Sequence, residues 1–304
     1  MDTAPAPTIT VAIPYYAGRS YLAEAIDSVR AQTVSDWQLL VVDDAGPEPA
    51  DDLVAAYADD RIEYVRNPVN RGLAGNWNEC VRRAATDLVT LLHGDDRLAP
   101  GYVAAVLAAS SAHGDAAAVF TDPVVIGADG RRTHSLPDAI KRFARRPRTD
   151  HLVGGDGDLA SILANNYIFC PTLCFRRAAI GDEPFDERWK MVMDLDLVAG
   201  LLLRSERLAA VRSPLYQYRR HAGNQTNVLT SSAVRFEEEL ALYREVAARA
   251  NEQGWSRTAR AARRRTMVRA HLALRAGLDF VAGRRGAART KAALLSDDLR
   301  RARS

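Results

Sequence analysis

The stretch that decides the fold is Asp87-Leu88-Val89-Thr90-Leu91-Leu92-His93-Gly94-Asp95-Asp96. Its first part, Leu88 to Leu92, has the length and composition of a strand that is buried on both faces of a sheet. The two carboxylates at its end would lie at the carboxyl edge of that sheet, where open α/β folds bind their ligands. Adjacent carboxylates repel each other unless a cation or a hydrogen-bond network lies between them. Taken alone, the stretch fits a cation site and a solvated turn before a helix equally well.

Strand and helix patterns alternate through the residues that precede this stretch. The expected strands cover residues 8–13, 37–42 and 61–65, and the expected helices cover residues 21–32, 49–57 and 76–85. This alternation predicts an α/β fold with a mostly parallel central sheet flanked by helices. The first strand is expected to end at Pro14, and no GxGxxG dinucleotide fingerprint follows it. A second acid pair, Asp43-Asp44, follows the second expected strand.

Beyond residue 100 the pattern becomes less regular. A strand is expected over 117–126, with a hairpin turn at 128–130, and a helix is expected to begin near Met193. Residues 134–158 show no periodicity, and we expect them to form a long irregular connection that contains Arg142, Arg145, Arg146 and Arg148. Residues 231–304 are rich in Ala and Arg and are predicted to be helical, with apolar stripes suited to packing.

Charge is distributed unevenly along the chain. Residues 231–304 carry 17 basic and 8 acidic side chains, whereas the whole chain has a net charge of +3. This C-terminal extension is therefore expected to pack on the rest of the chain or in a homodimer, or to meet an anionic membrane surface. The three cysteines have no CxxC spacing, which indicates neither a disulfide framework nor a zinc site. We expect a cytoplasmic protein, with peripheral contact at the inner membrane face as an option.

Four blocks of sequence resemble the inverting, nucleotide-sugar-dependent glycosyltransferases of family 2, which have the GT-A fold. They are Ile13–Tyr16, Val41–Asp44, Asn70–Asn78 and Leu92–Asp96. The resemblance extends over roughly residues 8 to 228 and implies a GT-A type α/β fold with a C-terminal helical extension. It assigns residues 1–100 to the half that binds the nucleotide sugar and residues 101–230 to the half that binds the acceptor. Residues 231–304 are the basic helical extension.

The resemblance also implies residues for the donor. Asp44 would accept a hydrogen bond from a pyrimidine, with Pro14 and Tyr16 beside the base. Asn78 and Arg219 would complete the nucleotide site. Asp95 and Asp96 would bind the ribose and a Mn²⁺ or Mg²⁺ ion, and His221 would supply a further metal or phosphate contact.

Three positions depart from the family pattern near the donor site or the base. His93 stands where an Asp is usual, so that it could contact ribose, hold the metal or simply pack. Trp77 stands where Arg is frequent, so either Arg71, Arg219 or Arg220 neutralises the diphosphate, or Trp77 is a core-facing helix residue. Gly200 replaces an Arg that is usual six residues after the catalytic acid.

The resemblance assigns the general base to Asp194. This acid lies in Met193-Asp194-Leu195-Asp196, where Met193 replaces the usual Glu. Asp196 would point about 200° away on a helix, so the two acids cannot serve the same hydroxyl. Asp194 could instead be a first-turn acid that stabilises the helix dipole.

The predicted function is therefore transfer of a sugar, in a UDP-linked donor, to a hydroxyl acceptor. The acceptor would be a saccharide, a lipid-linked saccharide or a natural product. One alternative is a sugar nucleotidyltransferase, although that class needs a Gly-rich basic loop after the first strand, which the Pro14–Ala17 segment does not provide. Another is a non-enzymatic basic adaptor acting through residues 231–304, for which few aromatic residues argue against nucleic acid.

Overall fold

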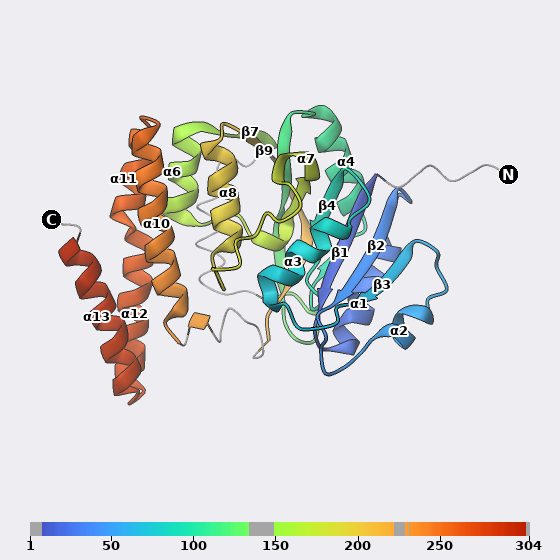
Figure 1. Ribbon diagram of the computed structural model, residues 1–304, viewed down its shortest axis with the longest axis horizontal. Helices are drawn as coiled ribbons and strands as arrows, with labels where there is room; N and C mark the ends of the chain where they lie inside the picture. The colour runs from blue at the N-terminus through green and yellow to red at the C-terminus, as the bar shows by residue number, and fades with distance from the viewer. Residues whose placement is uncertain (1–7, 134–148, 222–228, 231, 302–304) are drawn as a thin grey trace. The chain divides into compact units, whose positions relative to one another are not determined.

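The computed structural model describes residues 8–133, 149–221, 229–230 and 232–301 (Figure 1). The chain divides into two compact units. The first comprises Met1–Val153, Ile168–Glu187 and Glu206–Arg220, and the second comprises Gly154–Tyr167, Arg188–Ser205 and His221–Ser304. These units differ from the expected partition at residues 100 and 230, because two segments from the middle of the chain belong with the C-terminal helices.

The first four strands of the first unit form a parallel sheet in the order β3-β2-β1-β4. Helices connect them, as parallel pairing requires. The strands are β1 (Ile9–Tyr15), β2 (Trp37–Asp43), β3 (Ile62–Arg66) and β4 (Leu88–Leu91), and the helices are α1 (Arg19–Arg30), α2 (Asp51–Ala55) and α3 (Gly72–Arg83). This part confirms the parallel core that the alternating pattern predicts.

The remaining strands extend the sheet with mixed pairing. β8 lies antiparallel between β4 and β6, while β6 and β9 are parallel, and β5 and β7 pair antiparallel with β9. These elements are β5 (Arg97–Leu98), α4 (Tyr102–Ala112), β6 (Ala116–Ile126), β7 (His151–Val153), the 3-10 helix η1 (Cys170–Thr172), β8 (Leu173–Arg176), α7 (Arg177–Ile180) and β9 (Arg207–Arg219). The α/β class with a central sheet flanked by helices is confirmed.

Both faces of β1 are covered, which explains its continuous apolar composition. On one face Ile9, Val11 and Ile13 belong to a core shared with residues of α1 and α4. Helix α3 packs against β1 and β2 (Figure 1). The sheet is therefore a rigid middle layer, and the loops at the ends of its strands are held from both sides.

Two expected boundaries were wrong. β1 continues through Pro14 to Tyr15, because β4 pairs with β1 only as far as Ala12, so that Pro14 has a strand neighbour on one side alone. α3 begins at Gly72 and not at residue 76. The Asn70 side chain accepts a hydrogen bond from the Gly72 N–H at 2.7 Å, and Gly72 has a φ of 75°, which glycine adopts readily.

The expected irregular segment also contains regular structure. Residues 134–148, and with them the four arginines named above, lie outside the described residues. The later part forms β7 and the first turn of α6. The expected hairpin turn is confirmed, since Gly130 donates to the Gly127 carbonyl and residues 126 and 132 form an antiparallel bridge.

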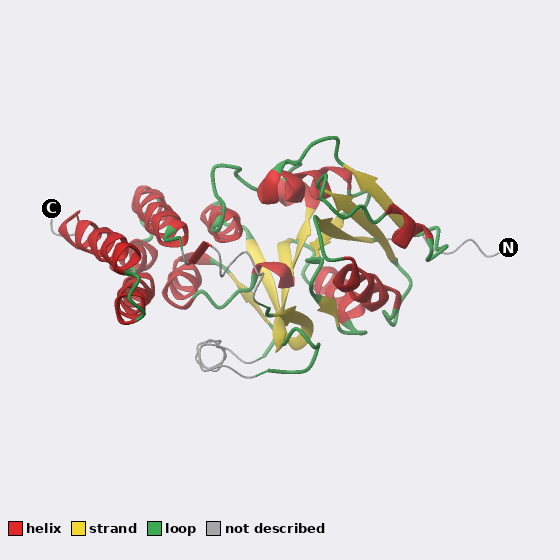
Figure 2. Ribbon diagram, turned by 90° about the horizontal axis from the view of Figure 1, so that it is seen from below, coloured by secondary structure: helices red, strands yellow, loops and turns green. Residues whose placement is uncertain are grey.

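The second unit is made of helices, which Figure 2 shows nearly end-on. They are α6 (Gly155–Asn165), α8 (Met193–Leu203), α10 (Val234–Glu252), α11 (Ser256–Arg264), α12 (Thr266–Val281) and α13 (Arg285–Arg301). Buried Phe236, Leu240 and Tyr243 on α10 form part of its core, and the Tyr243 hydroxyl donates to the Leu163 carbonyl at 2.6 Å. Within the described ranges, none of the helices is both long and apolar enough to cross a bilayer.

Buried ion pairs join α12 to α13. Asp279 accepts hydrogen bonds from Lys291 and from Arg284, each at 2.8 Å. The Lys291 hydrogen bond, followed by that of Arg284, holds the pKa of Asp279 below its usual value of 3.8. Because the folded-state pKa is depressed, this carboxylate stabilises the fold above pH 3.8, and the contribution is lost as the pH falls through the lower folded value.

We expect Asp279→Asn to lower the free energy of unfolding by about 3 to 5 kcal/mol near neutral pH, because it leaves the Lys291 ammonium buried without its counterion. The matched control is Asp297→Asn, which removes an exposed pair with Arg300 and should cost less than about 1 kcal/mol. Urea unfolding followed by circular dichroism measures both. The gap between Asp279→Asn and the native chain should narrow below pH 3.8; equal losses for the two variants would contradict this account.

Candidate functional site

The candidate site lies at the carboxyl ends of β1, β2 and β4. These strands are parallel neighbours, so the loops that follow them meet at the same edge of the sheet. The loop after β1 contains Tyr16, the loop after β2 contains Asp44, and the loop after β4 contains the acid pair Asp95-Asp96. Three of the sequence-predicted blocks are therefore brought to one edge by the topology.

The loops after β1 and β2 are in direct backbone contact. The Asp44 N–H donates to the Tyr15 carbonyl at 2.8 Å. A Cβ at Gly46 would overlap the carbonyl oxygen of Tyr16, so the approach of the two loops requires glycine there. Pro14 lies opposite Val42 in the ladder, and the Tyr16 side chain is 51% exposed. Pro14, Tyr16 and Asp44 are thus close neighbours, with an aromatic ring open to a ligand.

The two acids that end β2 have different environments. Asp43 is buried and accepts hydrogen bonds from the Gly46 N–H at 2.9 Å and from the Tyr64 hydroxyl and Arg66 guanidinium, each at 2.5 Å. These contacts make Asp43 a structural residue.

Asp44 is also buried, but it is engaged on one side only. Its Oδ1 accepts from the Arg71 N–H at 2.8 Å and from the Asn67 side chain at 3.0 Å. In the described part of the chain no hydrogen bond reaches Oδ2. Asp44 thus anchors the approach to α3 while keeping one oxygen for a donor group on a ligand.

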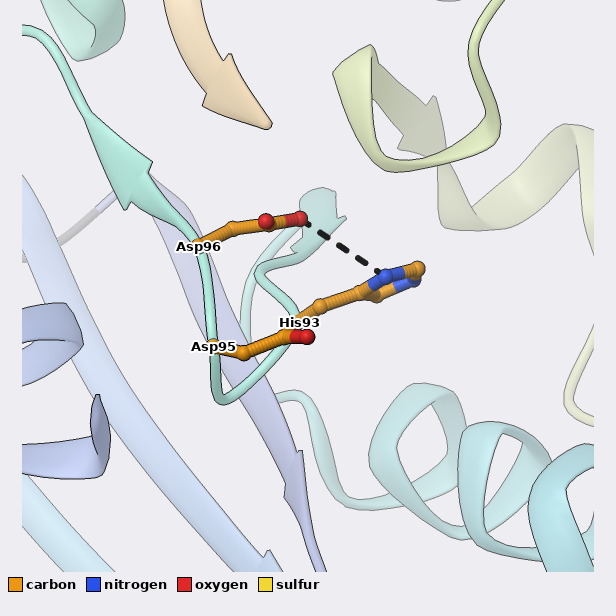
Figure 3. Close-up of side chains that lie close together, drawn as sticks. All are labelled: His93, Asp95 and Asp96. Carbon is orange, nitrogen blue, oxygen red and sulfur yellow. Dashed lines mark ion pairs between the residues drawn. The ribbon is translucent and has the colours of Figure 1, made fainter. Parts of the chain in front are cut away.

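His93, Asp95 and Asp96 form a compact cluster after β4 (Figure 3). One potential ligand atom from each residue lies within 4.8 Å of the others. The His93 Nδ1 is 3.7 Å from the Asp96 Oδ2, the pair marked by the dashed line in Figure 3. Two carboxylates and an imidazole at such distances match the donor set of a divalent cation site.

Asp96 is fully buried, and both of its oxygens are held by β9. Its Oδ1 accepts from the Arg219 N–H at 2.6 Å, and its Oδ2 accepts from the Tyr216 hydroxyl at 2.9 Å. Burial, followed by the charge of Asp95, raises the pKa of Asp96 well above its usual range. A cation beside the pair would oppose both effects by favouring the ionised carboxylate.

His93 supplies the buried nitrogen that tests whether a metal fits. Burial lowers the pKa of His93, although the Asp95 charge acts in the opposite direction, and the neutral ring carries a lone pair that can bind a cation. The Nε2 of His93 is buried and has no hydrogen-bond partner among the residues that the structure describes. The donor set therefore fits a divalent metal ion.

Arg219 does not offer its side chain to a nucleotide. It is fully buried, and its guanidinium donates to the Asp95 carbonyl at 2.6 Å, to the Ala128 carbonyl at 3.0 Å and to Glu24 at 2.5 Å. This geometry corrects the predicted ligand contact, because every guanidinium nitrogen already donates to the protein. Arg219 positions the Asp95-Asp96 loop instead.

Asn78 is likewise committed within the fold. Its side-chain amide donates to the Phe185 carbonyl at 2.8 Å and accepts from the Phe185 N–H at 2.9 Å. Trp77 is 4% exposed and packs against the rings of His93 and Phe185, with centroid separations of 5.2 and 5.1 Å. Trp77 is therefore the core-facing residue of the two alternatives, and Asn78 anchors the segment around Phe185.

The predicted base and the predicted histidine ligand belong to the second unit. Asp194 and Asp196 both lie in the first turn of α8, and each is partly exposed. Asp196 accepts a hydrogen bond from the Trp189 indole N–H at 3.1 Å. His221 lies two residues beyond the end of β9. The catalytic role of Asp194 and the metal role of His221 stay predictions.

Sequence reasoning gave no role to Tyr216 or Glu24. Tyr216 lies in a block that the family resemblance identifies, but the pattern does not tell that its hydroxyl bridges the His93 N–H and Asp96. Glu24 lies on α1, 195 residues before the Arg219 that it holds. The sequence carries no signal for this pair.

Comparison with known proteins agrees with this geometry. The model of the family described as "Glycosyl transferase family 2" matches residues 10–180. The succinoglycan biosynthesis protein ExoO of Rhizobium meliloti (strain 1021) is 26% identical over 224 residues, which cover 73% of this chain and 64% of ExoO. The Escherichia coli UDP-Glc:alpha-D-GlcNAc-diphosphoundecaprenol beta-1,3-glucosyltransferase WfgD is 30% identical over 88 residues, which cover 29% of this chain and 35% of WfgD.

Solved structures share the fold. S. aureus TarS 1-349 in complex with UDP-GlcNAc superposes with a TM-score of 0.63 at 18% identity, covering 80% of this chain and 66% of TarS. The chain spans less than two thirds of the length of the curated relatives named here. The family match nevertheless covers more than half of the chain and includes β1 to β4 with the loops that carry the acid pairs. The chain belongs to glycosyl transferase family 2.

Proposed function

We propose that this protein transfers a sugar from a UDP-sugar to a hydroxyl group of a saccharide or lipid-linked saccharide, with inversion at the anomeric carbon. The observation that carries the proposal is the meeting of Asp44, Tyr16 and the His93-Asp95-Asp96 cluster at one edge of a parallel sheet. Family membership supports the reaction class. The printed names of ExoO and WfgD and the UDP-GlcNAc complex of TarS favour a uridine donor and a glycan-related acceptor.

The nucleotide would be recognised by Asp44 and Tyr16. The Oδ2 of Asp44 can accept a hydrogen bond from the ring N–H of uracil while Oδ1 keeps its contact with the Arg71 N–H. The exposed ring of Tyr16 can lie along the base, beside Pro14. A cytosine ring lacks that N–H, so the arrangement favours uridine over cytidine.

The diphosphate would lie beside His93, Asp95 and Asp96, which would hold a Mn²⁺ or Mg²⁺ ion. The imidazole in this set favours Mn²⁺, because Mg²⁺ prefers oxygen ligands. When bound, the cation neutralises the negative charge that develops on the leaving diphosphate. Tyr216 and Arg219 keep the acid pair in place through the hydrogen bonds described above.

The general base would be Asp194. The acceptor oxygen attacks the anomeric carbon, the bond from that carbon to the diphosphate oxygen breaks, and the hydroxyl proton passes to the Asp194 carboxylate. Such a single displacement inverts the anomeric configuration and needs no protein nucleophile. The place of Asp194 in the first turn of α8 keeps it ionised, because the positive end of the helix dipole favours a carboxylate.

We expect Mn²⁺ to strengthen UDP binding at least tenfold, or about 1.4 kcal/mol, because the acid pair would otherwise repel the diphosphate. Isothermal calorimetry of UDP in chelator and in excess Mn²⁺ measures the difference. Asp95→Asn and His93→Gln should weaken Mn²⁺ binding itself, as measured by electron paramagnetic resonance, whereas exposed Asp51→Asn should not. Equal UDP affinity with and without the ion would refute the metal assignment.

We expect Asp44→Asn to weaken UDP binding by about 1 to 3 kcal/mol, the range for one hydrogen bond to a charged group. The Asn side chain keeps an oxygen for the Arg71 N–H, so the melting temperature should shift by only a few degrees. Asp43→Asn is the control, because it breaks the buried pair with Arg66 and should lower the melting temperature more. Calorimetry and thermal unfolding read the two effects separately. If the Asn variant at position 44 binds UDP normally, Asp44 is only a structural anchor.

We expect Asp194→Asn to lower turnover by about 10² to 10⁴-fold, because the variant keeps the shape but loses the proton acceptor. Donor affinity should stay within about twofold. Asp196→Asn is the matched control in the same helical turn, and it alters the contact with the Trp189 indole. Turnover with one acceptor and UDP affinity are measured for both. If Asp196→Asn is inactive and Asp194→Asn is normal, the base is assigned two residues too early.

A further inference from the structure

Helices α12 and α13 carry their charges inside and their apolar side chains outside. They lie side by side (Figures 1 and 2), and the buried Lys291 and Asp298 are 1% and 0% exposed. Asp298 pairs with Arg265 and with Arg269, at 3.3 and 2.8 Å. This polarity is the reverse of an ordinary surface helix, whose charged face lies in water.

The outer face of α12 is almost entirely apolar. The charged residues of this helix, Arg269, Arg275 and Asp279, are all partly or fully buried. The large apolar side chains that are instead exposed, by 47 to 85%, form what we call the α12 face: Met267, Leu274, Leu278, Phe280 and Val281. Four of them follow a spacing of three, four or seven residues along one side of the helix. An exposed apolar stripe of this kind marks a surface that meets another apolar phase.

Positive charge borders this face. A shallow groove of about 460 Å³ between the two helices is lined by Phe280, by alanines and by Arg285 and Arg289. Both arginines are exposed, and residues 256–301 carry 13 basic and 3 acidic side chains. A second copy of the chain would place the same positive charge against this border, which is unfavourable. An anionic lipid surface would neutralise it.

We propose that the α12 face docks on a lipid bilayer that contains anionic lipids. Phe280 and Val281 enter the boundary between headgroups and acyl chains, while Arg285 and Arg289 contact lipid phosphates. The combination of apolar insertion and positive charge is what interfacial helices use. The proposal concerns where the enzyme resides and does not depend on the reaction assigned above.

Flotation of the full chain with vesicles tests the proposal. We expect binding to vesicles of phosphatidylcholine mixed with phosphatidylglycerol, and at least tenfold weaker binding to phosphatidylcholine alone. Raising the salt concentration to about 0.5 M should also weaken binding, because the arginine contribution is screened. Equal binding to both kinds of vesicle, or binding to neither, overturns the proposal.

Paired variants separate the two contributions. Phe280→Ser with Val281→Ser should weaken binding at least tenfold through lost apolar insertion, and Arg285→Gln with Arg289→Gln should do so through lost charge. The controls make the same kinds of change at exposed residues of the first unit: Val69→Ser with Leu73→Ser, and Arg131→Gln with Arg132→Gln. Controls that lose as much binding as the α12–α13 variants contradict the assignment.

Two further measurements cover a folding failure and the competing occupant. Phe280→Trp keeps an apolar side chain, and its added fluorescence should shift to shorter wavelength and be quenched by brominated lipid in the anionic vesicles. No change in that emission overturns the proposal. Analytical ultracentrifugation without lipid should show a chain whose association does not change in Phe280→Ser with Val281→Ser. A dimer that this double variant dissociates would identify the α12 face as a contact between copies of the chain.

Discussion

The buried carboxylate of Asp96 is the contact on which the arrangement of the site depends. One oxygen accepts from the Tyr216 hydroxyl and the other from the Arg219 N–H, so that a loop after β4 is held by β9. A fully buried carboxylate without partners would cost several kcal/mol. The fold therefore cannot place Asp96 there without also placing β9 beside it, and Asp95 and His93 follow because they lie in the same short loop.

The guanidinium of Arg219 extends this linkage to α1. It reaches the Asp95 carbonyl and Glu24, and it lies 4.6 Å from the centroid of the Tyr21 ring. A residue that the family resemblance assigns to the ligand thus acts on the ligand site through the backbone. Its replacement would disturb the geometry of the acid pair before it disturbed any direct contact with a nucleotide.

The sequence alone was sufficient for the parallel half of the sheet and for the edge at which the site lies. Strands buried on both faces leave continuous apolar runs, and the acids that follow Val42 and Leu92 are visible at once. The sequence could not distinguish a ligand-facing polar residue from one that holds the fold. Asn78 and Arg219 both belong to matching blocks, yet their side chains are engaged by Phe185 and by Asp95, which are distant in sequence. Such choices depend on tertiary neighbours, and periodicity carries no information about them.

The linkage between Asp96 and β9 also has a consequence for how the protein is made. The two partners of this carboxylate are 120 and 123 residues further along the chain. β1 to β4 can pair soon after they leave the ribosome, but the cation-binding loop has no partners until β9 has been synthesised and added to the sheet. Contacts of such long sequence separation form late, because chain entropy must be lost before they are made. A nascent chain that ends before Arg207 would therefore hold a sheet edge without a formed acid cluster, and competence to bind a nucleotide would be acquired only near the end of synthesis.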